Sequence, residues 1–142
     1  MSKKLISALS MSLSFILLTS LSLAHEKDVQ YVFRNDVRPE YKNTITQDQF
    51  SKIQKNTNVT IIDVRLTEDF ALDPILIPGA EYKNPEKISS WADTIPKGKK
   101  VVLYCVKGAW VSHKAATYLT KKGYDVMTLD GGIRDWKLLN NK

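Results

Sequence analysis

Cysteine is nearly absent from this chain of 142 residues, which contains only Cys105. A single thiol excludes an intrachain disulfide, although exported proteins in oxidising compartments usually carry paired cysteines. The thiol is therefore either a small buried apolar side chain or a reactive group.

The sequence also lacks any run of basic residues interleaved with aromatic ones. Its formal net charge is +6, from 21 Lys and Arg against 15 Asp and Glu, and charges of both signs are interspersed. Such a distribution is typical of a solvated surface, so nucleic acid is not an expected partner. Beyond the first 24 residues there is no internal repeat or low-complexity segment, and the length suits one domain.

The first 24 residues have the three-part pattern of a secretory signal peptide. Lys3 and Lys4 precede a serine-punctuated apolar run that ends at Ser22-Leu23-Ala24. The serines disfavour the alternative of a transmembrane anchor, and no cysteine follows Ala24 to favour a lipoprotein anchor. We expect cleavage near Ala24, export to the bacterial periplasm, and no stable membrane anchor afterwards.

Residues 25–43 are polar and are expected to form an N-terminal arm ahead of a domain over residues 44–142. Thr46 followed by Gln49 is a capping-box pattern, which predicts the start of a helix.

Apolar runs predict buried parallel strands, and a helix over residues 112–123 ends at Gly123. Strands that alternate with helices indicate an α/β domain with a mainly parallel sheet. The predicted strands cover residues 59–64, 101–105 and 125–129.

Cys105 stands where a predicted strand meets the loop before a helix. Ligands bind at the carboxyl ends of parallel strands, and Gly108 allows the loop to turn tightly. Successive backbone N–H groups of this loop would then converge near the sulfur and stabilise an anion, including a thiolate. The alternative is that Cys105 only fills the core.

Five segments in order resemble the rhodanese-like superfamily, from about Ile45 to Lys137. They are IIDVR with Glu68 and Phe70 downstream, IPGA, VVLYC with Gly108, KAATYLTKKGYDV and LDGGIRDW. The resemblance implies a three-layer α/β domain, with a five-stranded, mainly parallel sheet and helices on both faces.

The resemblance also implies a sulfurtransferase, with Cys105 taking a sulfane sulfur from thiosulfate or a similar small anion. The persulfide is then passed to a thiophilic acceptor such as cyanide, a thiol or a protein, with no metal and no cofactor. The residues implied to cradle the sulfur and the donor are Val106, Lys107, Gly108, Ala109, Trp110, Val111 and Ser112.

Residues outside the loop are assigned supporting roles by the same resemblance. Asp63 is expected to tie loops together by hydrogen bonds, and Arg65 to pair with Glu68 or neighbouring groups. Gly131 and Gly132 are expected at a turn before the last helix, in a segment whose Trp136 packs in the core.

The loop departs from the common family pattern Cys-x-x-Gly-x-Arg-Ser. Ser112 is seven positions after Cys105 instead of six, and no arginine lies between them. Longer loops characterise related phosphatases and arsenate reductases, but those end in an arginine that binds the oxyanion. Sulfur transfer is therefore the favoured interpretation, and an oxyanion enzyme and a catalytically silent binding or sulfur-carrier module are the alternatives.

Two residues near the loop have two interpretations each. Trp110 either closes the site with an apolar wall or packs on the neighbouring arm. His113 either favours the thiolate or faces solvent from the helix.

Overall fold

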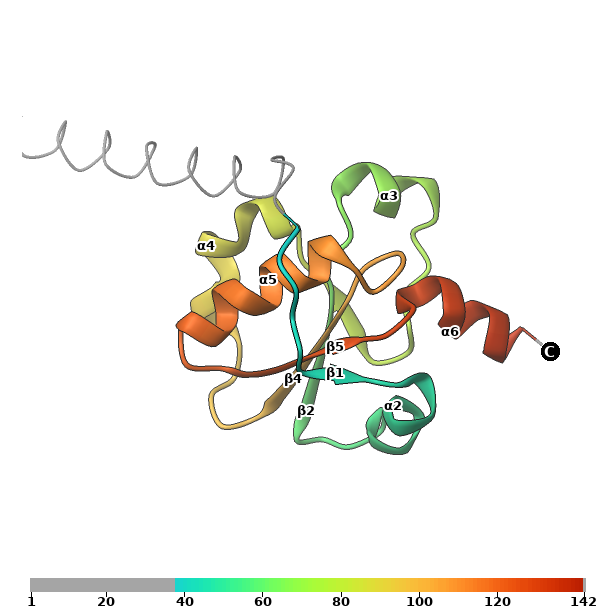
Figure 1. Cartoon of the computed structure of the whole chain (residues 1–142), viewed down its shortest axis with the longest axis horizontal. Helices are drawn as coiled ribbons and strands as arrows, with labels where there is room; N and C mark the ends of the chain where they lie inside the picture. Colours follow the sequence, from blue (N-terminus) through green and yellow to red (C-terminus); the bar gives the residue numbers. More distant parts are fainter. Residues whose placement is uncertain (1–37, 142) are drawn as a thin grey trace, which may run out of the picture.

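The computed structural model describes residues 38–141, and within them a five-stranded sheet forms the middle layer of an α/β domain (Figure 1). The strand order is β1-β5-β4-β2-β3, and every pair is parallel. The predicted fold class is thus confirmed. The expected signal peptide and residues 25–37 of the expected arm lie outside the described residues. The strands are β1 (Thr44–Ile45), β2 (Val59–Asp63), β3 (Ala80–Tyr82), β4 (Lys100–Tyr104) and β5 (Asp125–Leu129).

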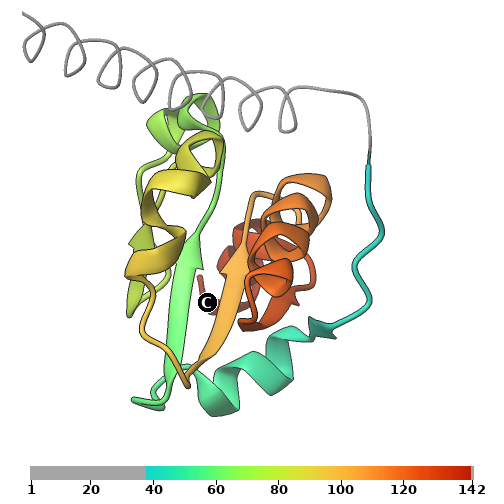
Figure 2. The same cartoon turned by 90° about the vertical axis from the view of Figure 1, so that its left-hand side faces the viewer.

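Helices cover both faces of the sheet (Figures 1 and 2). One face packs against α4 and α5, and the other against α2 and α6. No helix between residues 38 and 141 is long and apolar enough to cross a membrane. The helices are α2 (Gln47–Ile53), α3 (Thr67–Leu72), α4 (Ile88–Trp91), α5 (Trp110–Lys121) and α6 (Gly132–Asn140), with short 3-10 turns η1 (Pro85–Lys87) and η2 (Ala92–Thr94).

The central strand β4 is buried on both faces after its first residue. Its side chains alternate between the faces, so Val101 and Leu103 pack with α4 and α5, whereas Val102 and Tyr104 pack with α2 and α6. Cys105 follows the same alternation and belongs to the α4 and α5 side. The alternation of side chains along β4 therefore places the Cys105 thiol on the face covered by α4 and α5.

Local signals set the helix ends. The Thr46 hydroxyl accepts from the Gln49 N–H, and the Gln49 side chain accepts from the Thr46 N–H, so the predicted capping box is confirmed. Gly123 follows α5 with φ +90° and donates to the Thr120 carbonyl, as expected for a helix-ending glycine.

Helix α5 begins at Trp110, two residues before the predicted start at Ser112. Gly108 has φ +66°, and this left-handed residue turns the chain sharply enough for the helix to start early. The loop between β4 and α5 therefore comprises only residues 105–109. Trp110, Val111 and Ser112 belong to the first helical turn.

Candidate active site

Cys105 directly follows β4 and is 5% exposed. It lines a cavity of about 230 Å³ together with Asp69 of α3 and residues of the following loop and helix. Five of the seven predicted loop residues share this lining, while Gly108 and Ser112 do not. The five are Val106, Lys107, Ala109, Trp110 and Val111.

The N-terminus of α5 opens onto this cavity. The first N–H groups of a helix have no intrahelical partner, and at α5 the N-cap residue Ala109 supplies no side-chain hydrogen bond. By contrast, α2 is capped through Thr46 and Gln49. The uncapped first turn of α5 therefore leaves its backbone donors, and the positive end of the helix dipole, available beside Cys105.

Ser112 connects the thiol to this first turn. Its buried hydroxyl accepts a hydrogen bond from the Cys105 Sγ at 3.4 Å and donates to the Ala109 carbonyl at 3.0 Å. Ser112 therefore contacts the Cys105 sulfur, although it does not line the cavity.

Helix α6 holds the loop from the opposite side. The Ile133 and Arg134 N–H groups donate to the Cys105 and Val106 carbonyls, each at 3.0 Å. In a trans peptide the C=O and N–H point in opposite directions, and none of the described peptides is cis. The amides that follow these two carbonyls, those of Val106 and Lys107, are thus directed away from α6. Val106 and Lys107 both line the cavity, whereas no α6 residue does.

Two glycines make this contact possible. A Cβ on Gly108 would lie 2.2 Å from the Leu129 carbonyl oxygen, and a Cβ on Gly132 would lie 2.3 Å from the Cys105 carbonyl oxygen. Gly132 has φ +56° and, with Gly131 at φ +73°, forms the turn predicted before the last helix. Both positions therefore exclude a side chain for reasons of space as well as backbone conformation.

Asp63 and Arg65 form a buried ion pair outside the cavity lining. Arg65 is 2% exposed and Asp63 fully buried, and the guanidinium Nη2 lies 2.6 Å from the Asp63 carboxylate. The same guanidinium donates to the Asp73 and Ile75 carbonyls at 2.8 and 2.9 Å. The pair therefore fastens the segment between α3 and β3 to the end of β2. The sequence had indicated Glu68 or neighbours for Arg65, and the structure pairs it with Asp63.

Tyr104 lies beside this ion pair because β4 is paired with β2. Its buried hydroxyl accepts from the Ile77 N–H at 3.2 Å. Burial raises the pKa of Tyr104, and the neighbouring Asp63 carboxylate adds to this rise. The tyrosine is thus a neutral structural group beneath the site.

The sequence did not single out Asp69 as a site residue. It lies in the first turn of α3, and only the packing of α3 over the sheet edge brings it to the cavity. No sequence spacing relative to Cys105 could have indicated this contact.

Trp110 fulfils both of its predicted roles, since it lines the cavity and lies beneath the arm residue Arg38. His113 faces the arm as well. Its Nδ1 lies 3.3 Å from the Pro39 carbonyl oxygen, and its Nε2 is buried. His113 is half-buried because residues 38–43 cover part of it, so the solvent-facing interpretation holds only in part.

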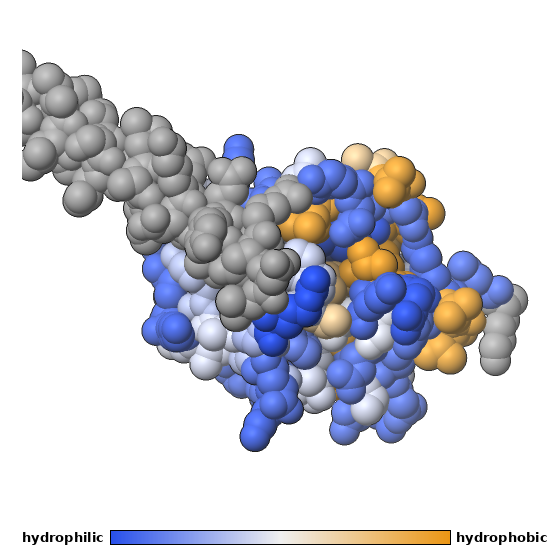
Figure 3. Space-filling model, turned by 45° about the horizontal axis from the view of Figure 1, so that its top comes forward, coloured by the Kyte–Doolittle hydropathy of each residue, from blue (hydrophilic) through white to orange (hydrophobic). Residues whose placement is uncertain are grey.

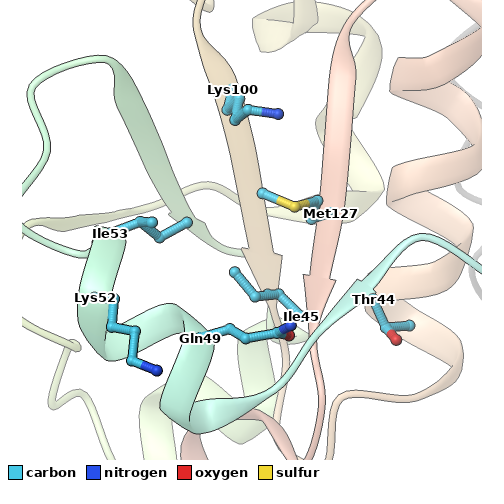
Figure 4. Close-up of a pocket in the computed structure, with 7 residues that line it drawn as sticks. All are labelled: Thr44, Ile45, Gln49, Lys52, Ile53, Lys100 and Met127. Atoms are coloured by element: carbon cyan, nitrogen blue, oxygen red, sulfur yellow. The ribbon is translucent and has the colours of Figure 1, made fainter.

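A second cavity, of about 420 Å³, lies at the other end of the sheet (Figure 4). Its lining includes Lys100, the first residue of β4, and Cys105 follows the last residue of that strand. Five residues of strand span roughly 17 Å, so the two cavities are separate. Lys52 and Lys100 in this lining form ion pairs with Asp48 and Asp125.

Large apolar side chains are exposed over α3 and at the end of α6 (Figure 3). Leu72 is 86% exposed and ends the helix that carries Asp69, and Ile75 follows in the next loop at 58%. On α6, Leu138 and Leu139 are 72% and 55% exposed. An ion pair between Lys137 and Asp73 joins the two regions.

Known proteins resemble this chain over most of the described residues. Residues 46–139 match the family model of the rhodanese-like domain. A sulfurtransferase of Allochromatium vinosum is 34% identical over 96 residues, which cover 66% of this chain and 87% of that protein. A tRNA sulfurtransferase of Shewanella sediminis is 36% identical over 72 residues, 49% of this chain but only 15% of that protein.

Solved structures agree with this similarity. A rhodanese-like domain protein from Staphylococcus aureus is 27% identical, with a TM-score of 0.59 over 67% of this chain and 91% of its own. A rhodanese-related protein from Thermoplasma volcanium has a TM-score of 0.60 over 70% of this chain and 94% of its own. At 19% identity, the latter shows the shared fold alone.

Proposed function

The chain belongs to the rhodanese-like domain family, and from this membership we propose that Cys105 carries a sulfane sulfur from thiosulfate or a similar donor to cyanide or a thiol. The family and the relatives named as sulfurtransferases support sulfurtransferase activity in general. The donor, the acceptor and the persulfide on Cys105 are the proposed parts.

One observation carries the proposal: Cys105 lines a cavity at the uncapped N-terminus of α5. A helix N-terminus and inward-directed loop amides attract anions. The donor, the thiolate nucleophile and the persulfide product are all anions. The same backbone groups therefore suit each stage of the reaction.

The proposed reaction has two steps. The Cys105 thiolate attacks the outer sulfur of thiosulfate, the sulfur–sulfur bond breaks, and sulfite leaves with the bonding electron pair. The persulfide anion then gives its outer sulfur to cyanide, which becomes thiocyanate, and the thiolate is restored. With a thiol acceptor, the attacking thiolate becomes the new persulfide.

The oxyanion-enzyme alternative lacks support in the cavity. Its lining has one cation, Lys107, and one carboxylate, Asp69, and no arginine. A phosphate group is usually held bidentately by arginine. We therefore expect no Cys105-dependent hydrolysis of aryl phosphates and no arsenate reduction.

Intact-mass analysis after incubation with thiosulfate tests the proposed function. The reduced protein is expected to gain one sulfur atom on Cys105, and cyanide is expected to remove it with release of one equivalent of thiocyanate. Cys105→Ser keeps a side chain of similar size and is expected to remain folded without gaining sulfur. If the wild-type protein takes no sulfur from thiosulfate or other sulfane donors, the silent binding module becomes the better interpretation.

We propose further that the protein is exported and that a protein thiol is among its acceptors. The signal-peptide pattern of residues 1–24 supports export. The exposed Leu72 and Ile75, on and after the helix that carries Asp69, support contact with a protein surface. N-terminal sequencing of the exported protein is expected to begin within a few residues of His25, and an intact Met1 in a membrane fraction would contradict export.

A further inference from the structure

The described part of the N-terminal arm, residues 38–43, contacts both helix α5 and strand β5. Tyr41 donates to the Val126 carbonyl at 2.8 Å and lies 2.8 Å from the Thr120 hydroxyl. Asn43 donates to the same Val126 carbonyl at 2.7 Å. These contacts, and that of Pro39 with His113, hold the arm against α5 and β5 (Figure 1).

Arg38, the first described residue of the arm, lies close to the cavity. The guanidinium carbon of Arg38 lies 4.8 Å from the centre of the Trp110 ring, and Trp110 lines the cavity. The buried Lys114 places its ammonium 5.0 Å from the same ring centre. Arginine over the face of tryptophan is a favourable contact even at an exposed site. Arg38 does not itself line the cavity, but this contact places its charge beside a residue that does.

The side chains that line the cavity carry little net charge to attract an anion over a distance. Among the residues that line the cavity, the positive charge of Lys107 is balanced by the negative charge of Asp69. The segment from Cys105 to Ser112 contains no arginine. Backbone dipoles act over short distances, whereas the field of a full charge extends to about the Debye length, ~8 Å at physiological ionic strength.

We propose that Arg38 of the N-terminal arm is a specificity-determining residue, which raises the local concentration of the anionic sulfur donor at the Cys105 cavity. This proposal rests on the proposed function only in naming the anion a sulfur donor. It adds a cation to Lys107 and Lys114, from a segment about 70 residues before the catalytic loop. Trp110 is the residue that connects the two.

Charge-selective alkylation of Cys105 tests the proposal without any sulfur chemistry. Iodoacetate is an anion and iodoacetamide is neutral, so the ratio of their rates reports the potential near the sulfur and cancels changes in thiolate population. At low ionic strength, Arg38→Gln is expected to lower this ratio about two-fold or more, the order of the effect of one unit charge on another across roughly 10 Å of water. Thiosulfate carries two negative charges, so its KM is expected to rise by about the square of that factor, with kcat unchanged.

Two variants control for general effects. Lys42→Gln removes an equal charge from the same arm and is expected to leave both measurements unchanged. Arg38→Lys keeps the charge and is expected to restore most of the ratio. An Arg38→Gln protein with wild-type ratio and KM, or an equal fall in Lys42→Gln, would overturn the proposal. If the ratio falls as expected but thiosulfate loads no sulfur, the anion site stands and the proposed donor is wrong.

Discussion

Two neighbouring strands end at the same edge of the sheet, and their charged and reactive groups are used in opposite ways. After β2, Asp63 and Arg65 are buried and bind each other and nearby carbonyls. After β4, Cys105 opens onto a cavity in which the first turn of α5 lacks a side-chain cap. Asp63 and Tyr104 are partners in the strand register, so these two regions are adjacent.

The difference shows how one sheet edge can supply both rigidity and reactivity. The ion pair after β2 satisfies its own hydrogen bonds, and such a group holds a loop in place but has no capacity left for a ligand. After β4, α6 binds the Cys105 and Val106 carbonyls, and the N–H groups of the same two peptides point away from α6. The buried ion pair after β2 and the cavity after β4 therefore lie on neighbouring strands.

Breaking the buried ion pair is expected to have the largest effect on stability. Arg65→Met leaves the Asp63 carboxylate buried without its cation and is expected to lower the free energy of unfolding by about 3–5 kcal/mol. Urea unfolding measures this loss. Cys105→Ser, one strand away, is expected to change stability by less than about 1 kcal/mol.

A double variant distinguishes the cost of leaving one buried charge unpaired from the cost of lost side-chain packing. Asp63→Asn together with Arg65→Met removes both charges, so it is expected to be more stable than Arg65→Met alone. A single Arg65→Met protein with wild-type stability would contradict the structural role assigned to the pair.

Gly108→Ala is expected to lower the rate of sulfur transfer, because Gly108 lies in the loop after Cys105. A left-handed backbone at a non-glycine residue costs about 1–3 kcal/mol, and the new Cβ would lie 2.2 Å from the Leu129 carbonyl oxygen. The loop must therefore move away from α6. A displacement of about 1 Å can lower a rate about a hundredfold, which stopped-flow measurement of sulfite release would detect.

Gly98→Ala is the matched control for this variant. Gly98 also has a positive φ, +77°, but a Cβ there meets nothing within 4 Å. It is expected to lose stability by a similar backbone cost without the loss of rate. Equal rates in the two alanine variants would show that contact between the loop and α6 is irrelevant to transfer.

Lys107→Ala is expected to have the smallest effect. The side chain is exposed, and the backbone N–H groups remain in place without it. The KM for thiosulfate should rise about two- to four-fold, as for one charge near the surface, with little change in kcat. Asp69→Asn is expected to shift KM in the opposite direction. A total loss of transfer in Lys107→Ala would mean that its charge, and not the backbone, binds the donor.

Much of the fold was predictable because its signals are local. The capping box at Thr46, the apolar runs of the strands and the helix-ending Gly123 each depend on a few adjacent residues. The start of α5 was less predictable, since it depends on how tightly the chain turns at Gly108. The sequence predicted that Arg65 pairs with Glu68 or neighbouring groups, and only the folded end of β2 shows that its partner is Asp63.

The sequence by itself determined the α/β class, the family and the cysteine at the end of β4, because apolar periodicity and motif order are properties of the chain. Only the tertiary structure decided what surrounds that cysteine. Asp69 reaches the cavity from α3, and α6 binds the loop carbonyls. Arg38 reaches Trp110 from the N-terminal arm. These contacts join residues distant in sequence, and they follow from the packing of separate elements at one edge of the sheet.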